Sequence, residues 1–358
     1  AAPARTGGAG GRLLGDRRRA ALAGGALLLV AVAVGLGLLG GDDDGSGGGA
    51  GNPNTTNAAG DGGRAASVVD ITRKELLTRP NALAIASGHV WALSNRTGDV
   101  VLVDAETGAP RERLNVGKSG SSLAAGFNSV WVTKEATSSV LRFDARSRRR
   151  AAGGSLRVGR PGRNVAVVTG ARAVWVAVRN ERDADRSPEA VVRIDPRTGE
   201  QQTIAVPGGV QDLAVGEGAV WVSNRFGSTV TRIRVSDGAQ DVVEVGAGPK
   251  GLAVGEGAVW VASSGSDEIT RINPRTLGTR SIALGAIPER VTVGGGSVWV
   301  TAKEAGRLIR IRPSTRRVLE RIDTGPRPYA LDVTRGRAVW VSILDDNGLQ
   351  RVRIAPRG

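Results

Sequence analysis

The sequence of 358 residues contains no cysteine, no methionine and a single histidine. Without cysteine the chain has no disulfide, no thiol nucleophile and no cysteine-ligated metal. One histidine also excludes a zinc site built from several histidines, although carboxylate ligands remain available. Aromatic residues make up only 3% of the chain and comprise seven Trp, three Phe and one Tyr. With 23% charged and 40% apolar residues, the chain has the composition of neither a disordered polyelectrolyte nor a polytopic membrane protein.

One long apolar run occupies residues 20–40 and contains no charged residue. At about 1.5 Å per residue, a helix of this length spans the roughly 30 Å hydrocarbon core of a bilayer. Arginines at 17–19 precede the run and aspartates at 42–44 follow it. The positive-inside rule therefore predicts a single-pass anchor in the cell membrane, with residues 1–19 cytoplasmic and the rest outside. The alternative is a cleaved secretory signal, whose apolar region is usually shorter.

Residues 41–66 are rich in Gly, Asp and Asn and show no apolar periodicity. This composition predicts a flexible spacer between the membrane span and the sequence that follows. The chain begins with Ala1, which fits either removal of an initiator methionine or excision from a longer protein.

Residues 67–358 contain repeats of about 40 residues, each marked by a Val-Trp pair, with successive tryptophans 40, 44, 46, 39, 39 and 41 residues apart. In the fourth unit the runs 210–215, 219–223, 228–235 and 240–245 are separated by turn residues, which predicts four antiparallel strands. Four strands in a repeat of this length are typical of a β-propeller blade. The seven tryptophans are Trp91, Trp131, Trp175, Trp221, Trp260, Trp299 and Trp340.

The repeats predict an all-β, seven-bladed β-propeller with four-stranded blades. Each tryptophan is expected to pack between neighbouring blades, because the Val-Trp pairs place apolar side chains on both faces of their strand. The last unit supplies only three strands, whereas the run 67–73 has no hairpin partner of its own. We therefore predict that this N-terminal run closes the ring as the outer strand of the seventh blade.

Three recurring elements of the repeats resemble the YVTN-type propellers and the related streptogramin lyase-like proteins. They are a G-x-G-[AS]-V-W-V turn and strand, the element VVRIDPRTG at 191–199, and the segment VGAGPKG at 245–251. The resemblance covers residues 67–358 and implies the propeller fold, while its structural motifs say little about function. Five turn residues are expected to cap backbone N–H groups locally: Asp104, Asp144, Asp195, Asp237 and Asn273.

Streptogramin lyases, as the resemblance implies, use histidine and glutamate with a magnesium ion near one face of the propeller. The only histidine here, His89, begins a second strand at the position of Ala219 and Ala258, which is distant from that face. We therefore predict no catalytic residue, no metal site and no cofactor. The adjacent carboxylates at 267–268 and 345–346 are the remaining candidate cation ligands, although such loop pairs are usually solvated.

The order of cytoplasmic end, single span, Gly-rich spacer and outer propeller also resembles the sensor half of actinobacterial receptor-type serine/threonine kinases. The sequence itself carries no kinase motif. A kinase region is therefore expected only if the protein extends upstream of Ala1.

Nearly all of the formal net charge of +15 belongs to the propeller, because residues 1–66 contribute only +1. In a propeller, the segments that join successive blades surround one mouth of the central channel, and the loops between second and third strands open on the same face. The joining segments contain Arg79, Lys118, Arg160, Arg163, Lys250, Arg290 and Arg327. The loops add Arg96, Lys134, Arg179, Arg182, Arg225 and Lys303.

The joining-segment residues form a predicted basic collar that would attract anions by field focusing, such as anionic cell-envelope polymers, phosphorylated glycans or lipid headgroups. The competing interpretation is that the arginines reflect composition and are solvated singly. Nearby acids also dilute the charge: Glu135, Glu181, Glu289 and Glu304. Nucleic acid is not expected as a partner, because the predicted location is extracytoplasmic and few aromatic residues remain for stacking.

The sequence therefore favours a non-enzymatic, membrane-anchored extracytoplasmic module that binds or senses a ligand. A metal-dependent lyase-like enzyme and a protein-binding scaffold are the alternatives.

Overall fold

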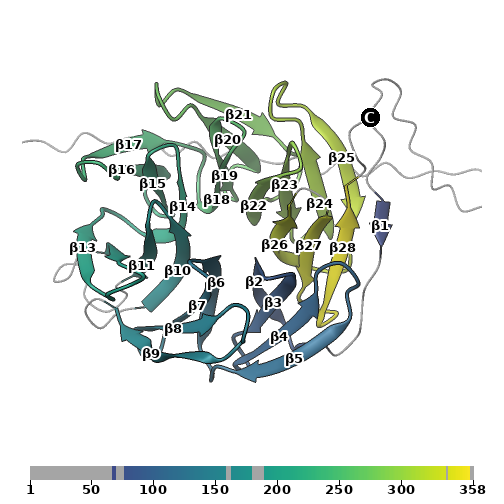
Figure 1. Cartoon of the computed structure of the whole chain (residues 1–358). Helices are drawn as coiled ribbons and strands as arrows, with labels where there is room; N and C mark the ends of the chain where they lie inside the picture. Colours follow the sequence, from purple (N-terminus) through teal and green to yellow (C-terminus); the bar gives the residue numbers. More distant parts are fainter. Residues whose placement is uncertain (1–66, 70–75, 159–162, 180–188, 336–337, 355–358) are drawn as a thin grey trace, which may run out of the picture. The chain divides into compact units, whose positions relative to one another are not determined.

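The computed structural model describes residues 67–69, 76–158, 163–179, 189–335 and 338–354. Every regular element in these ranges is a β-strand, and the strands form seven four-stranded antiparallel sheets. The sheets stand as blades around a central channel (Figure 1). The prediction of a seven-bladed propeller with four-stranded blades is confirmed.

Within each blade the strands follow one another from the channel outward. Blade 1 contains β2 (Pro80–Ala86), β3 (His89–Ser94), β4 (Asp99–Asp104) and β5 (Pro110–Asn115). Blade 2 contains β6 (Gly120–Gly126), β7 (Ser129–Lys134), β8 (Ser139–Asp144) and β9 (Arg150–Arg157). Blade 3 contains β10 (Arg163–Gly170), β11 (Ala173–Arg179), β12 (Ala190–Ile194) and β13 (Gln201–Ala205). Blade 4 contains β14 (Val210–Gly216), β15 (Ala219–Asn224), β16 (Thr229–Arg234) and β17 (Gln240–Glu244), close to the predicted ranges.

The last three blades follow the same order. Blade 5 contains β18 (Pro249–Gly255), β19 (Ala258–Ser263), β20 (Glu268–Ile272) and β21 (Thr279–Ala283). Blade 6 contains β22 (Arg290–Gly294), β23 (Ser297–Ala302), β24 (Arg307–Ile311) and β25 (Val318–Asp323). Blade 7 contains β26 (Pro328–Thr334), β27 (Ala338–Ile343), β28 (Gly348–Arg353) and, as its outer strand, β1 (Ser67–Val69).

The N-terminal strand closes the ring as predicted. β1 pairs antiparallel with β28, with Ser67 opposite Arg353 and Val69 opposite Arg351, and it lies at the outer edge of blade 7 in Figure 1. Blade 7 is thus built from both ends of the propeller sequence. This pairing protects the backbone of β28, which would otherwise be an open edge.

Packing between blades rests on the tryptophan of each second strand. All seven indole side chains are buried, and each belongs to a core cluster with residues of the following blade. Trp260, for example, packs with Val298, Val300 and Ile309 of blade 6. Trp340 of blade 7 packs with Val90 and other residues of blade 1, so that the apolar packing is continuous around the ring.

Close contact between neighbouring inner strands depends on a small residue at the end of the inner strand, which is alanine in blade 1 and glycine in blades 2–6. A Cβ atom at Gly216 would lie 2.5 Å from a methyl carbon of Val254 in the next blade. Gly255 and Gly294 stand against Val293 and Val333 in the same way. The glycines in the G-x-G turns of the repeat therefore serve the packing of one blade on the next, in addition to the turn itself.

The predicted cytoplasmic segment, membrane span and spacer (1–19, 20–40 and 41–66) lie outside the described residues. No helix in the described ranges is long and apolar enough to cross a membrane. The membrane anchor therefore stays a prediction from sequence.

Candidate functional site

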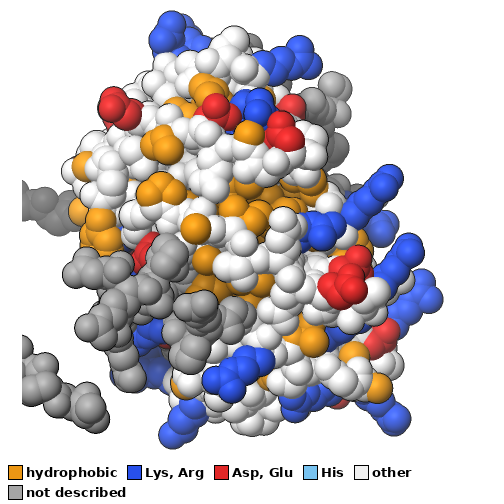
Figure 2. Space-filling model, turned by 90° about the vertical axis from the view of Figure 1, so that its left-hand side faces the viewer, with side chains coloured by type: hydrophobic (Ala, Val, Ile, Leu, Met, Phe, Trp, Pro, Cys, Tyr) orange, Lys and Arg blue, Asp and Glu red, His pale blue; other side chains and the backbone are white. Residues whose placement is uncertain are grey.

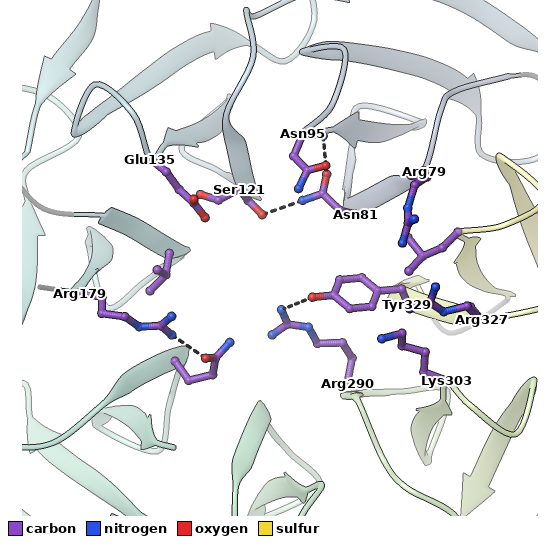
Figure 3. Close-up of a pocket in the computed structure, with 13 residues that line it drawn as sticks. Arg79, Asn81, Asn95, Ser121, Glu135, Arg179, Arg290, Lys303, Arg327 and Tyr329 are labelled. Carbon is purple, nitrogen blue, oxygen red and sulfur yellow. Dashed lines mark hydrogen bonds between the residues drawn. The ribbon is translucent and has the colours of Figure 1, made fainter. Parts of the chain in front are cut away.

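A hollow of about 310 Å³ lies at one mouth of the central channel (Figure 3). Its walls come from three kinds of position, which are the segments before the inner strands, the first residues of those strands, and the turns between second and third strands. The lining residues are Arg79, Asn81, Asn95, Ser121, Glu135, Val165, Arg179, Gln211, Arg290, Lys303, Arg327, Tyr329 and Leu344. The lining contains five cationic side chains and one carboxylate.

The predicted collar is only partly assembled. Arg79, Arg290 and Arg327 line the hollow, and they are joined by Arg179 at the end of β11 and by Lys303 in the turn after β23. The remaining collar residues in the described ranges, Lys118, Arg163 and Lys250, do not line it. Arg96 and Arg225 are exposed outside the lining. Arg160 and Arg182 lie outside the described residues.

Arg290 crosses the channel to a carboxylate two blades away. Its Nη1 donates to Oδ2 of Asp212 at 3.1 Å, and its Nη2 donates to the Tyr329 hydroxyl at 3.2 Å, with the guanidinium 5.3 Å from the Tyr329 ring centre. Gly251, at the matching position of blade 5, has no side chain to block this path. Burial lowers the pKa of Arg290, but Tyr329 and Asp212 raise it by more, so the guanidinium stays charged. Arg290 is therefore a fixed, compensated charge.

Two further lysines at this face are also engaged by the protein. Lys250 Nζ lies 2.8 Å from a carboxylate oxygen of Glu289 in the next blade, and both side chains are mostly buried. Lys134 Nζ donates to the backbone carbonyls of Val116, Gly117 and Lys118. Burial lowers the pKa of Lys134. Neither lysine is available to a ligand in this arrangement.

Three cations remain weakly compensated, and we call Arg79, Lys303 and Arg327 the basic sector. They come from blades 1, 6 and 7 and lie on one side of the hollow, around Tyr329 (Figure 3). Lys303 Nζ is 3.4 Å from Glu304, whose side chain is 61% exposed, and Arg327 Nη1 is 3.7 Å from Asp345. The buried Nε of Arg327 has no hydrogen-bond partner among the described residues. Both contacts are longer than the one between Lys250 and Glu289, and both carboxylates are exposed to solvent. Pairs of this kind contribute little and leave the cations open to a stronger anion.

Two members of the basic sector adopt an unfavourable backbone conformation. Arg79 has a φ of 46° and Arg327 a φ of 58°. Blades 4 and 5 place Gly209 and Gly248 immediately before their inner strands, with φ of 80° and 61°. A residue with a side chain costs roughly 1–2 kcal/mol in this left-handed region, whereas glycine adopts it readily. Blade 2 has Ser119 at the same position, with a φ of 70°, so the left-handed backbone is a feature of these joining segments in the repeat.

The opposite wall of the hollow is polar and mostly uncharged. Asn81 Nδ2 donates to the Ser121 carbonyl at 3.1 Å, and its Oδ1 accepts from the Asn95 backbone N–H at 2.8 Å. Arg179 donates to the Val210 carbonyl and to Oε1 of Gln211. These bonds fix the wall in place before any ligand binds.

Sequence reasoning missed this polar wall and Tyr329. Asn81, Ser121, Gln211 and Tyr329 occupy the same position of the inner strands of blades 1, 2, 4 and 7, one residue before the position of Asp212. The signal that could have found them is this register, since the repeat makes the inner strands align. The chain's only tyrosine at a channel-mouth position was the most visible part of that signal.

Sequence reasoning also missed where much of the positive charge goes. Arginines of the third strands stack on the tryptophans of their own blades, with guanidinium carbons 5.0–5.9 Å from the ring centres. Arg142 and Arg232 also donate to the carbonyls of Pro196 and Pro274 in the next blade. Figure 2 shows further Lys and Arg side chains spread over the side of the ring, with Asp and Glu interspersed among them. The net charge is therefore distributed over the propeller, and only a small part of it faces the hollow. The stacked arginines are Arg142, Arg193, Arg271, Arg310 and Arg351.

The predicted turn caps are present. Oδ1 of Asp104 accepts from the N–H groups of Glu106 and Thr107, and Asp144, Asp195 and Asn273 bond their turns in the same way. Hydrogen bonds from the turn backbone hold the pKa of Asp144 and Asp195 below the usual value. Asp237 differs, because it lies later in its turn, where its Oδ1 accepts from one backbone N–H, that of Ala239, and from Nε of Arg234.

His89 lies at the far end of β3 from the hollow, as predicted. β3 has six residues and so places His89 about 20 Å from the turn that carries Asn95. His89 Nδ1 is 2.8 Å from the Ser87 carbonyl. In the described ranges, no group of three or more His, Cys, Asp or Glu side chains is placed to hold a metal ion.

Comparisons with known proteins show the fold alone. No protein-family model matches the chain, and no curated protein matches it significantly. Virginiamycin B lyase from Staphylococcus aureus superposes with a TM-score of 0.69 at 15% identity, over 81% of this chain and 100% of that chain. The WD40 repeats of RRP9 superpose with a TM-score of 0.66 at 10% identity, over 81% and 97%. Hydrazine synthase from Kuenenia stuttgartiensis gives 0.66 at 14% identity, over 79% and 97%. The streptogramin lyase-like propeller fold expected from the repeats is thus supported, and it is shared by enzymes and WD40 proteins.

Proposed function

We propose that this chain is a non-enzymatic binding module whose propeller takes an anionic ligand at the channel mouth. In this proposal the span at 20–40 anchors the chain in the membrane and holds the propeller outside the cell, where it senses or captures the ligand.

The basic sector is the observation that carries the proposal. Arg79, Lys303 and Arg327 converge on a hollow. Four other cations of the same face are engaged by carboxylates or backbone carbonyls, namely Lys134, Arg179, Lys250 and Arg290. Like charges placed together in a concave site raise the local concentration of anions. Their mutual repulsion and the left-handed backbone at Arg79 and Arg327 both cost stability. A bound anion would relieve the repulsion.

The residues that line the hollow support anion binding more strongly than the fold does. Structural relatives include both a lyase and WD40 proteins, so the fold by itself favours neither catalysis nor scaffolding. A hollow lined by five cations and a single carboxylate is suited to hold an anion.

The test compares two double variants with the same loss of charge. Arg79→Gln with Arg327→Gln removes two cations from the basic sector. Arg197→Gln with Arg275→Gln removes two exposed cations from turns between third and fourth strands, which lie at the opposite face. Pyrophosphate binding to the full chain is measured by calorimetry at low ionic strength, where screening is weak.

We expect the basic-sector variant to weaken pyrophosphate binding at least tenfold and the control variant to change it less than twofold. Equal weakening by both variants, or no binding by the unaltered chain, would overturn the proposal.

A further inference from the structure

The hollow has two chemically different walls. The basic sector occupies one side, with Tyr329 between its members, and the amides of Asn81 and Asn95 lie away from it (Figure 3). The amide of Gln211, bonded to Arg179, completes this amide wall. A ligand that fills the hollow therefore meets weakly compensated cations at one end. At the other end it meets amides, together with Arg179, which is bonded to Gln211, and the carboxylate of Glu135.

The amide wall still has free hydrogen-bonding capacity. Gln211 Oε1 accepts from Arg179, but no described residue bonds to its Nε2. The side-chain amide of Asn95 has no protein partner in the described ranges and is exposed at the rim. An amide offers both a donor and an acceptor, which matches a hydroxyl group because a hydroxyl also does both.

Tyr329 extends this capacity toward the basic sector. Its hydroxyl oxygen accepts from Arg290 at 3.2 Å, so its proton remains available for donation. Because Arg290 is held by Asp212 at 3.1 Å, the hydroxyl is fixed in position before a ligand arrives. A ligand oxygen next to the basic sector can therefore receive a neutral hydrogen bond as well as charge.

The placement of the single lining carboxylate restricts where a negative group can lie. Glu135 stands on the amide side of the hollow, and Arg163 lies 3.7 Å from it at the surface. A second anionic group on that side would meet this carboxylate. The arrangement suits a molecule with one anionic end and an uncharged, hydroxyl-bearing body.

The size of the hollow limits that body to a small one. Its volume of about 310 Å³ lies at the lower end of the range for ligand pockets, which is roughly 300–1,000 Å³. One sugar ring with one charged substituent is of the right order. Val165 and Leu344 supply the only aliphatic side chains of the lining, so most contacts are polar.

We infer that the ligand of this site is a sugar unit carrying one phosphate or carboxylate, with the anion on the basic sector and the hydroxyls on the amide wall. This inference rests on the proposed function, since it names the class of anion that the channel mouth would bind. Guanidinium groups are well suited to both oxyanions, because they offer paired N–H donors in one plane.

The test uses four probes on the full chain: inorganic phosphate, glucose, glucose 6-phosphate and glucuronate. We expect glucose 6-phosphate to bind at least tenfold more tightly than inorganic phosphate, and glucose alone to bind too weakly to measure. The comparison of glucose 6-phosphate with glucuronate shows whether the site prefers phosphate or carboxylate, and tight binding of either one supports the inference.

Variants of the amide wall separate this inference from the proposed function. Asn95→Ala with Gln211→Ala should reduce the preference for glucose 6-phosphate over phosphate to less than threefold and leave phosphate affinity unchanged within twofold. Gln202→Ala is the control, because Gln202 is exposed on β13, the outer strand of blade 3. Equal affinity of the unaltered chain for phosphate, glucose 6-phosphate and glucuronate would overturn the inference and leave the proposed function standing. Absence of all anion binding would overturn both.

Discussion

The contact between Gly216 and Val254 allows a quantitative test of how the blades pack. In Gly216→Ala the new Cβ atom would lie 2.5 Å from Cγ1 and 3.0 Å from Cβ of Val254. Carbon atoms in good contact are about 3.5–4.0 Å apart, so one blade must move by about 1 Å relative to the next. Overpacking of this kind costs about 1–3 kcal/mol. Alanine also has less backbone freedom than glycine in the unfolded chain, and this offsets about 0.5–1 kcal/mol of that cost.

We therefore expect Gly216→Ala to lower the free energy of unfolding by about 1–2 kcal/mol. This corresponds to a fall in melting temperature of about 2–8 °C for a domain of this size. Urea denaturation followed by tryptophan fluorescence measures the free energy directly, because all seven tryptophans are buried. Gly278→Ala is the control, since its Cβ would meet only ordinary contact at 3.4 Å.

The second half of the test removes the obstacle. Blade 1 has Ala86 at the position of Gly216, and it faces Ala125 at the position of Val254. The protein itself thus tolerates alanine where the neighbour is small. Val254→Ala should be destabilising alone, yet in the double variant the two effects should be less than additive by about 1–2 kcal/mol. Strict additivity would refute the proposed steric contact.

Three other predictions follow from the same packing. Trp260 and Trp340 are both buried beneath an arginine at 5.9 Å, but of the two only Trp260 donates a hydrogen bond from Nε1. In urea denaturation, Trp260→Phe should therefore lower the free energy of unfolding by about 1 kcal/mol more than Trp340→Phe. Equal costs would contradict this. Deleting 67–69 should lower the melting temperature by about 5 °C through loss of the closing strand, whereas deleting 64–66 should not. Burial raises the pKa of Asp332 to about 6, against hydrogen bonds from two backbone N–H groups, so its carboxyl carbon should titrate near that pH by NMR. Because the folded pKa lies above the ordinary 3.8, ionisation of Asp332 reduces stability as the pH rises through 6, and titration near 3.8 would refute this.

Much of the fold could be predicted because each repeat specifies its own strands and turns through residues that are close in sequence. The regular spacing of Trp91 and its six counterparts specified seven units, and the turn residues between β-branched runs specified the strands within each unit. Even the closing strand followed from counting, since the last unit lacked one strand and the first had one left over. These features depend on residues within one repeat of about 40 residues, and patterns over that length can be recognised from the sequence alone.

The candidate site could be predicted only in part from the sequence. Knowledge of propeller geometry placed the joining segments and the loops on one face, and Arg79, Arg290 and Arg327 do line the hollow there. Whether a charge is free depends on its partner, however. Nothing near Lys250 in the sequence identified Glu289, 39 residues away, as the group that compensates it.

By itself, the sequence determined the number of blades, the four strands within each and the residues that pack between them, because these are set by local periodicity and burial. The tertiary structure alone decided which of the many arginines and lysines face a ligand. Arg290 and Asp212 are 78 residues apart and meet across the channel because Gly251 stands between them without a side chain. Electrostatic compensation depends on distance in space, so only the closed ring separated the basic sector from the charges that the protein itself neutralises.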